Sequence, residues 1–296
     1  MIILGTSAIG GWNWGGSDHK NDLEAIQASL DLGITHIDTA PIYGMGRSEE
    51  CIATAIEGRR HEVVLATKCG LEWEGSQVWR NAKPERIAYE CEESLRRLQT
   101  DYIDLYQIHW PDSLVPIEES WQAMLKLKEQ GKVRRIGVCN YTLQQLKTAH
   151  EIHPVDTIQL PYSFIRRGIE EEIVPFCIQH AIAVLIYCPL ERGLLTGKIA
   201  PEHQFPDSDQ RSSLPEFSAN VRKKIWEACQ ELQPIADKQG CTIAQLVLSS
   251  LRAKQWISGI LVGARNRAQA IENGQAQTLL PNDMVEAIFL KQGVVL

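Results

Sequence analysis

The sequence predicts an α/β fold, a (β/α)8 TIM barrel formed as a single domain over residues 1–296. Short apolar runs alternate with longer stretches of helical spacing along the whole chain, which indicates parallel β/α architecture. Eight such runs are present, and eight is the number of strands in this barrel. The length of 296 residues fits one α/β barrel domain.

Each short apolar run is an expected strand. The eight ranges are 2–5, 35–38, 63–67, 103–107, 135–139, 157–160, 183–187 and 259–262. Helices are expected between them, for instance over 85–98 and 117–129, where apolar residues recur every three or four positions. Pro84 suits a first helical turn, Gly131 is a stop signal, and one more helix is expected around 283–290.

A doubly wound open sheet is the competing architecture. No expected strand is followed by G-x-G-x-x-G, and the P-loop-like string at 193–198 has the wrong glycine spacing, so the barrel is favoured. Residues 196–219 interrupt the strand–helix rhythm and are rich in Pro, Ser, Asp and Gln. Such a long loop in a compact domain is typical of a functional lid or of disorder.

Charge and hydropathy exclude several classes of protein. The net charge is −7, and no basic block is present, which argues against nucleic acid as a partner. The longest apolar run, 181–187, is too short to cross a bilayer, and the N-terminus lacks the basic region of a secretory signal. The eight cysteines form no C-x-x-C pair and no metal-ligand spacing with histidine. We therefore expect reduced thiols, no metal site, no membrane segment and a cytoplasmic location.

Polar side chains end the expected strands, where a barrel of this class places its chemistry. In chain order they are Asp38, Lys68, His109, Asn140, Gln159, Tyr187, and Gly263 with Arg265. Asn140 on its own suits an ordinary turn. Lys68 and His109 are not turn formers, and each directly follows a run apolar enough to be buried, so they indicate one site.

Asp38, Tyr43 and Lys68 suggest a way to reduce a C=O group. A phenol is a poor proton donor at neutral pH unless a nearby cation favours its phenolate form, and a lysine ammonium does so. An aspartate would keep that lysine charged, and a histidine could hydrogen-bond the carbonyl oxygen. An ion pair beside a packed aromatic ring, with no catalysis, explains the same residues equally well at this point.

Four segments closely resemble the signature segments of the aldo-keto reductase family, in the branch that includes the potassium-channel β subunits. They are GITHIDTAPIYGMGRSEE, VVLATKCG, YIDLYQIHWPD and RRIGVCNYT. The resemblance implies a catalytic tetrad of Asp38, Tyr43, Lys68 and His109. It assigns Tyr43 as general acid and His109 as the residue that orients the substrate oxygen. The implied reaction is reversible, NADPH-dependent reduction of aldehydes or ketones to alcohols, with a small-molecule carbonyl compound as substrate.

The resemblance also implies where an extended nicotinamide cofactor binds. Asn140 and Gln159 resemble the pair that binds the carboxamide, and Tyr187 the aromatic residue that stacks on the ring. The other implied cofactor residues are Gly5, Thr6 and Asp38 at the nicotinamide; the backbone of Cys188, Pro189, Leu190, Glu191 and Arg192 with Lys198 at the pyrophosphate; Gly263, Arg265 and Gln269 at the 2′-phosphoribose; and Glu272 and Asn273 at the adenine. Residues 189–220 are then a candidate cofactor-covering loop.

The chain departs from the family pattern in several places. Cys139 stands where many members carry Ser, which weakens one hydrogen bond near the carboxamide. Gly263 and Gln269 replace the basic residues that bind the 2′-phosphate, which leaves Arg265 as the expected phosphate partner, so NADPH is preferred and NADH is less favoured. The first strand lies almost at the N-terminus, so something other than the usual hairpin is expected to close the barrel bottom.

Trp12 and Trp110 follow expected strands and are the candidate walls of an apolar substrate pocket. Two other functions compete with the reductase. One is a nicotinamide-nucleotide-binding regulatory or redox-sensing protein with little turnover, against which the intact tetrad argues. The other is a metal-dependent barrel isomerase or hydrolase, which needs more His, Asp or Glu ligands at strand ends than this chain offers.

Overall fold

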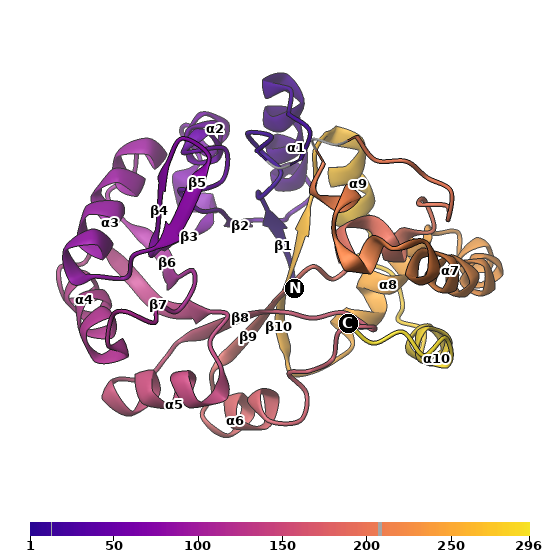
Figure 1. Ribbon diagram of the computed structural model, residues 1–296. Helices are drawn as coiled ribbons and strands as arrows, with labels where there is room; N and C mark the ends of the chain where they lie inside the picture. Colours follow the sequence, from indigo (N-terminus) through magenta and orange to yellow (C-terminus); the bar gives the residue numbers. More distant parts are fainter. Residues whose placement is uncertain (13, 207–208) are drawn as a thin grey trace.

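A closed barrel of eight parallel strands forms the centre of the computed structural model, which describes residues 1–12, 14–206 and 209–296 (Figure 1). The strand order around the barrel is β1-β10-β9-β8-β7-β6-β3-β2. The barrel strands are β1 (Ile2–Gly5), β2 (His36–Asp38), β3 (Val64–Cys69), β6 (Ile103–Ile108), β7 (Val133–Cys139), β8 (Thr157–Pro161), β9 (Ala183–Tyr187) and β10 (Ile257–Gly263). All eight expected strands are confirmed, with ends that differ by at most two residues.

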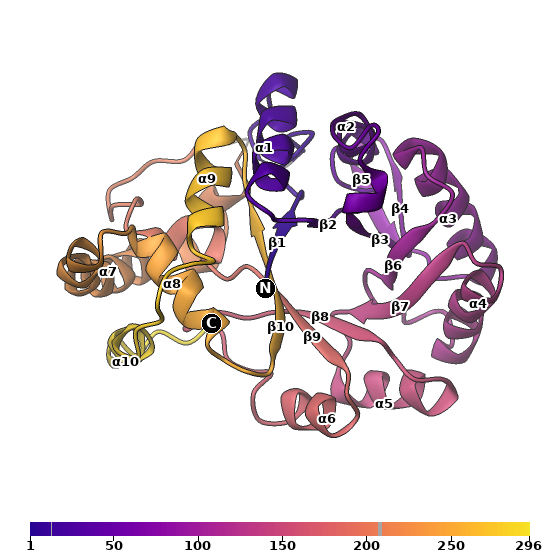
Figure 2. The same cartoon turned by 180° about the vertical axis from the view of Figure 1, so that it is seen from behind.

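Helices surround the strands on the outside, as the two opposite views show (Figures 1 and 2). They are α1 (His19–Asp31), α2 (Arg47–Ala55), α3 (Pro84–Leu98), α4 (Ile117–Glu129), α5 (Leu143–Ile152), α6 (Ile173–Gln179), α7 (Ala219–Gln239), α8 (Ile243–Arg252), α9 (Arg267–Gln275) and α10 (Met284–Lys291), with a 3-10 turn η1 (Arg60–Glu62). Pro84 opens α3 as expected. Gly131 follows α4 with a φ of +74°, a conformation that suits glycine at a helix end.

An antiparallel hairpin, β4 (Leu71–Glu74) with β5 (Gln77–Arg80), follows β3. This hairpin was not predicted from the sequence. Its pairing places Leu71, Trp73, Val78 and Arg80 on one face, because directly opposed residues of an antiparallel pair point to the same side. The hairpin is joined to α3, since Arg86 contacts Glu72 at 3.3 Å.

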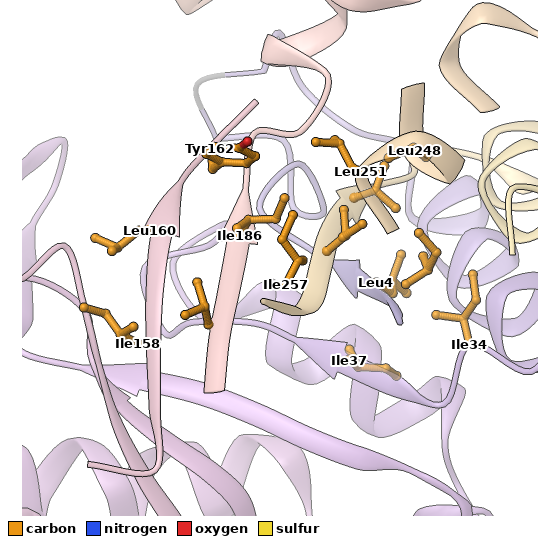
Figure 3. Close-up of a cluster of buried hydrophobic side chains, with 14 of the residues drawn as sticks. Leu4, Ile34, Ile37, Ile158, Leu160, Tyr162, Ile186, Leu248, Leu251 and Ile257 are labelled. Atoms are coloured by element: carbon orange, nitrogen blue, oxygen red, sulfur yellow. The ribbon is translucent and has the colours of Figure 1, made fainter. Parts of the chain in front are cut away.

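Two apolar layers hold the barrel together, because successive residues of a strand point to opposite sides. Outward-facing residues pack against the helices, and Figure 3 shows Leu4 and Ile257 in one cluster with Leu248 and Leu251 of α8. A smaller cluster fills the barrel interior: Ile3, Ala66, Leu105, Leu185 and Leu261. Ala66 and Leu185 of this cluster lie two residues before the polar strand ends Lys68 and Tyr187, so the cluster forms an apolar floor beneath the polar site.

Gly259 makes this interior packing possible. A Cβ at that position would lie 2.5 Å from Ile3 Cδ1 and 2.9 Å from Leu185 Cδ2, closer than real Cβ contacts come. Near the N-terminal ends of the strands, the pKa of His36 is lowered by burial, then by the charges of Arg135 and the chain's amino group. These groups therefore lie close together at the end of the barrel opposite the site.

Residues 189–220 form an ordered excursion rather than an unstructured one, apart from 207 and 208, which lie outside the described residues. It holds the 3-10 turns η2 (Glu191–Thr196), η3 (Gln210–Ser212) and η4 (Pro215–Phe217). Phe217 is buried, and Arg192 pairs with Glu216 at 2.8 Å. The loop reaches the segment after β1, where Trp14 and Asp209 form an antiparallel bridge.

Glu90 predicts how stability changes with pH. Its buried carboxylate accepts a hydrogen bond from the backbone N–H of Gly70, just after β3. Burial raises the Glu90 pKa to about 7, against the lowering effects of that bond and of Arg86. A carboxyl group whose pKa is raised in the folded state loses stability as pH rises from its unfolded pKa through its folded one.

We therefore expect the free energy of unfolding to fall between about pH 5 and 7, by up to about 3 kcal/mol from this group. Glu90→Gln keeps an acceptor for the Gly70 N–H and should remove the decrease in the free energy of unfolding that Glu90 causes. Urea unfolding at several pH values measures it, with Glu151→Gln on exposed α5 as the control. An unchanged pH slope in the Glu90 variant would contradict the assignment.

Candidate active site

Lys68 lies at the centre of a group of side chains at the C-terminal ends of β2, β3 and β6. Its Nζ donates to Asp38 Oδ1 at 2.5 Å, to the Thr39 carbonyl at 2.8 Å and to the Tyr43 hydroxyl at 3.3 Å. Parallel strands bring these residues together because their C-terminal ends meet at one face of the barrel. The Tyr43 oxygen accepts from Lys68, so its own proton is free to point at another acceptor.

The charges of this group depend on its burial. Lys68 is fully buried, and Asp38 is 2% exposed. Burial is the largest single effect and lowers the Lys68 pKa, but the Asp38 carboxylate, Tyr43 and Cys139 together raise it by more, so the net pKa lies above its usual value. The ammonium is therefore charged at neutral pH, and its counterion is a direct neighbour.

Tyr43 corrects one expectation from the sequence. Lys68 does lower the Tyr43 pKa as expected, but burial raises it more, and the net pKa lies above its usual value. The reason is that a phenolate in this water-poor setting loses more hydration than one ammonium returns. Tyr43 accordingly holds its proton at neutral pH, as a proton donor must.

His109 lies next to Tyr43, directly after β6. The two rings meet edge to face, with centroids 5.8 Å apart and planes at 84°. Burial, and after it the charge of Lys68, lowers the His109 pKa well below its usual value. The imidazole is therefore neutral at neutral pH and offers one N–H donor.

Two glutamines bind the second oxygen of Asp38. Gln159 Nε2 donates to Oδ2 at 2.8 Å, and Gln107 Nε2 donates to the same atom at 3.2 Å. Gln159 was predicted at the site, and Gln107 was missed. The available signal was an amide side chain two residues before His109, which period-two alternation places on the same side of β6.

Asn140 joins three strand ends. Its Nδ2 donates to the His109 carbonyl at 3.0 Å, and its Oδ1 accepts from the Tyr187 hydroxyl at 2.8 Å. Its backbone is left-handed, with a φ of +61°, and its N–H donates to the Gln159 carbonyl at 3.0 Å. Cys139, just before it, is buried, which raises the pKa of its thiol.

The expected nicotinamide residues of β1 lie against the same group. Thr6 Oγ1 donates to the Asp38 carbonyl at 3.1 Å. Gly5 lies between Asp38 and Gly263 in register, and a Cβ on Gly263 would approach only the Gly5 carbonyl, at 3.6 Å. These small residues leave backbone exposed at the strand ends, which suits close approach of a flat ligand.

Two clefts lie at the expected adenosine end. One, of about 460 Å³, is lined by residues 15–18 with Asn21, Arg265, Asn266 and Gln269. There Arg265 Nη2 donates to the Gly16 carbonyl at 2.7 Å, and the Arg265 N–H donates to Gln269 Oε1 at 2.9 Å. Arg265 and Gln269, expected to share the 2′-phosphoribose, therefore lie in one cleft.

The second cleft, of about 660 Å³, is lined by Lys198, by the end of α7 and its connection to α8, and by residues of α8 and α9. Lys198 Nζ pairs with Glu272 at 2.8 Å, so residues expected at the pyrophosphate and at the adenine contact each other here. Asn273 is buried, and its Nδ2 donates to the Gly263 carbonyl at 3.0 Å. Lys198 and Glu272 remain predicted ligands of the cofactor.

The backbone of 188–192 turns sharply above the strand ends. Cys188, Glu191 and Arg192 have φ values of +57°, +44° and +51°. The Glu191 side chain is buried and accepts from Ser163 Oγ at 2.7 Å and Arg166 Nε at 3.1 Å. The Glu191 side chain is thus engaged by Ser163 and Arg166, and the binding of a cofactor by the backbone of this segment, which includes Pro189 and Leu190, stays a prediction.

Trp12 and Trp110 are both half-buried, in the segments after β1 and β6. The Arg80 guanidinium of the β4–β5 hairpin lies 5.2 Å from the centre of the Trp110 ring. Their role as substrate walls stays a prediction.

The donor set fits a nicotinamide cofactor. Gln159 uses only its Nε2 on Asp38, which leaves Oε1 for a carboxamide N–H, and Tyr187 ends β9 beside Asn140. Within the described residues, no cluster of three or more His, Cys, Asp or Glu side chains could hold a metal ion. No helix of the described chain is long and apolar enough to span a membrane.

Comparison with known proteins identifies the family. The model of the Aldo/keto reductase family matches residues 1–289. The chain belongs to the aldo/keto reductase family. It is accordingly an oxidoreductase of the NAD(P)H-dependent class, and the resemblance seen in the sequence is confirmed.

Curated relatives match most of this reductase. "Aldo-keto reductase YhdN" of Bacillus subtilis is 45% identical over 271 residues, covering 90% of this chain and 82% of the relative. "NADH-specific methylglyoxal reductase" of Escherichia coli is 35% identical over 310 residues, covering 96% of this chain and 94% of the relative.

Solved structures match the reductase over nearly its whole length. The glycerol dehydrogenase AKR11B4 from Gluconobacter oxydans has a TM-score of 0.90 at 38% identity, covering 98% of this chain and 90% of that one. An aldo-keto reductase from Klebsiella pneumoniae in complex with NADPH has a TM-score of 0.75 at 28% identity, covering 100% and 91%. The barrel fold is thus shared with both of these enzymes.

The position of the 189–220 loop predicts how cofactor binding changes its amide hydrogen exchange. Because the loop already contacts the segment after β1, we expect an added cofactor to lie beneath it and to slow amide exchange in 196–206 and 209–219. Hydrogen–deuterium exchange with and without NADPH measures this, with α5 as an internal control. Equal exchange in both states would contradict a covering role.

Proposed function

We propose that this protein reduces aldehyde or ketone carbonyls to alcohols with NADPH, and that Tyr43 is the general acid. The observation that carries the proposal is the direction of the hydrogen bonds around Lys68. Lys68 donates to the Tyr43 oxygen at 3.3 Å, so the phenolic proton is left for the substrate. Family membership supports the reaction class.

The residues divide the work as follows. A reduced nicotinamide, when bound, supplies the hydride to the carbonyl carbon. Tyr43 donates its proton to the carbonyl oxygen, and the neighbouring Lys68 ammonium stabilises the phenolate that remains. Neutral His109 donates a hydrogen bond to the same oxygen and orients it. Asn140 and Gln159 would hold the carboxamide of the bound cofactor, and Tyr187 would pack on its nicotinamide ring.

Small carbonyl compounds are the proposed substrates. Trp12 and Trp110 provide apolar walls, and the related proteins are named for methylglyoxal and glycerol, both of which are small. Alcohol oxidation is the same reaction in reverse, so the direction follows the ratio of reduced to oxidised cofactor. The proposed location is the cytoplasm.

Tyr43→Phe tests the general acid. The variant keeps the ring and loses the proton, so we expect reduction of 4-nitrobenzaldehyde to fall by 10²-fold or more, with cofactor affinity within about threefold. Absorbance of the reduced cofactor and quenching of tryptophan fluorescence measure the two. Retention of most of the activity would refute Tyr43 as the acid. Tight cofactor binding by the unaltered protein without turnover of any aldehyde would instead support the regulatory alternative.

We propose NADPH over NADH on the placement of Arg265. Its guanidinium lines the cleft expected to hold the 2′-phosphate, and a guanidinium binds phosphate well. Asp18 lines the same cleft and caps α1 through the Asn21 N–H at 2.9 Å. A carboxylate there repels a phosphate, so Asp18 limits the preference that Arg265 creates.

A pair of variants measures this balance. Arg265→Ala should weaken NADPH binding by about 10- to 100-fold and NADH by much less, because a hydrogen bond to a charged group is worth about 1.5–3 kcal/mol. Asp18→Asn retains the helix cap and should strengthen NADPH binding a few-fold with NADH unchanged. Fluorescence titration with both cofactors gives the four constants. Equal effects on the two cofactors would place the phosphate elsewhere.

A further inference from the structure

A single row of residues crosses the barrel at the level of the site. Lys68 of β3 is in register with Gln107 of β6, which is in register with Gly137 of β7, and Gly137 pairs with Thr157 of β8. The residue two positions before Gln107 is Leu105, in the apolar floor. Gln107 therefore stands where the polar layer meets that floor.

Gln107 is fully buried and makes an incomplete set of hydrogen bonds. Its Nε2 donates to Asp38 Oδ2 at 3.2 Å, while its Oε1 has no partner within the described residues. A buried amide oxygen without a partner costs free energy, and an aliphatic side chain of similar size would avoid that cost. Packing alone thus gives no reason for an amide here, whereas Asp38 gives one.

The neighbouring strand makes room for this amide. A Cβ on Gly137 would lie 2.1 Å from Thr157 Oγ1 and 3.3 Å from Gln107 Cγ. Thr157 Oγ1, like Gln107 Oε1, has no partner among the described residues. The absence of a side chain at 137 therefore lets two buried polar groups sit beside each other without clashing.

We infer that Gln107 is a positioning residue for proton donation: it holds Asp38 so that Oδ1 faces Lys68. This inference rests on the proposed function. Gln159 donates to the same Oδ2, but it is also the expected partner of the cofactor carboxamide. Cofactor binding can therefore change the contact between Gln159 and Asp38. Gln107 lines neither of the two clefts described above, and within the described residues its side chain hydrogen-bonds only to Asp38. It keeps the carboxylate oriented whatever contact the cofactor makes with Gln159.

Three successive contacts connect Gln107 to the Tyr43 hydroxyl, which carries the proton to be donated. Gln107 fixes Asp38, Asp38 fixes the Lys68 ammonium, and Lys68 binds the Tyr43 oxygen. The titratable groups around these contacts are Asp38, Tyr43, Lys68, His109, Cys139 and Tyr187. A change at Gln107 should therefore alter the chemical step and leave cofactor binding nearly intact.

Three variants test the inference on the full-length protein, after the unaltered protein has been shown to reduce 4-nitrobenzaldehyde. Gln107→Leu removes the donor at similar volume. Gln107→Glu keeps the shape and donates only while its carboxyl is protonated. Thr157→Val is the matched control, since it deletes a buried hydroxyl in the same row that binds nothing in the described structure. The readouts are kcat, the KM for NADPH and the aldehyde, and the pH profile of the rate relative to the unaltered protein.

We expect Gln107→Leu to lower kcat by about 10- to 100-fold, which corresponds to the loss of one hydrogen bond to a charged group, with the KM for NADPH within threefold. The relative rate of Gln107→Glu should be near that of the unaltered protein at about pH 5. It should fall at least tenfold by pH 9, because two adjacent carboxylates repel once both are ionised. Thr157→Val should keep its relative rate at every pH.

Two results would overturn the inference. One is a Gln107→Leu variant with unchanged kcat, and the other is a Gln107→Glu profile that runs parallel to that of the unaltered protein. Equal losses in Gln107→Leu and Thr157→Val would assign the row a packing role only. Failure of the unaltered protein to reduce any aldehyde counts against the proposed function, which is a separate result.

Discussion

The buried ion pair between Asp38 and Lys68 is the interaction on which the rest of the site depends. Two charges removed from water lose much hydration, and their attraction offsets that loss only where further hydrogen bonds satisfy the remaining atoms. Here they do. Lys68 uses its three donors on Asp38, Thr39 and Tyr43, and the second oxygen of Asp38 accepts from Gln107 and Gln159. The pair is costly to build and therefore well defined in geometry.

The barrel supplies the conditions under which this pair acts. The interior cluster that includes Leu105 and Leu261 excludes water from below, and the strand ends bring residues from β2, β3, β6 and β8 to one point. Exclusion of water keeps Tyr43 protonated and His109 neutral, which is the state in which each can donate a hydrogen bond. The apolar floor is thus part of the chemistry and not only part of the stability.

Much of this could be predicted from the sequence, because barrel strands are short apolar runs and a lone Lys or His at the end of such a run stands out. Lys68 and His109 were found in that way, Tyr43 was added as a proton donor that a nearby lysine could assist, and the family resemblance joined them with Asp38 as a tetrad. The β4–β5 hairpin could not be predicted from apolar runs, because it is a local pairing with an exposed outer face and has no strong apolar pattern. The sequence also could not predict whether the Tyr43 pKa is raised or lowered overall, because that depends on how far burial outweighs the charge of Lys68. Gln107 was missed because alternation shows which side of a strand a residue faces but not which acceptor it meets.

Lys68→Met tests the central claim most directly, because it removes the charge that links Asp38 to Tyr43 and keeps a side chain of similar length. Breaking a buried pair leaves one uncompensated charge and costs about 3–5 kcal/mol of stability. The double variant that combines Asp38→Asn with Lys68→Met removes both charges and serves as the folded control, with folding checked by circular dichroism. The measurement is the single-turnover rate of aldehyde-dependent oxidation of NADPH. The account predicts that both variants bind NADPH and that both lose at least 10³-fold in this rate. A rate within tenfold of that of the unaltered protein in either variant would contradict it.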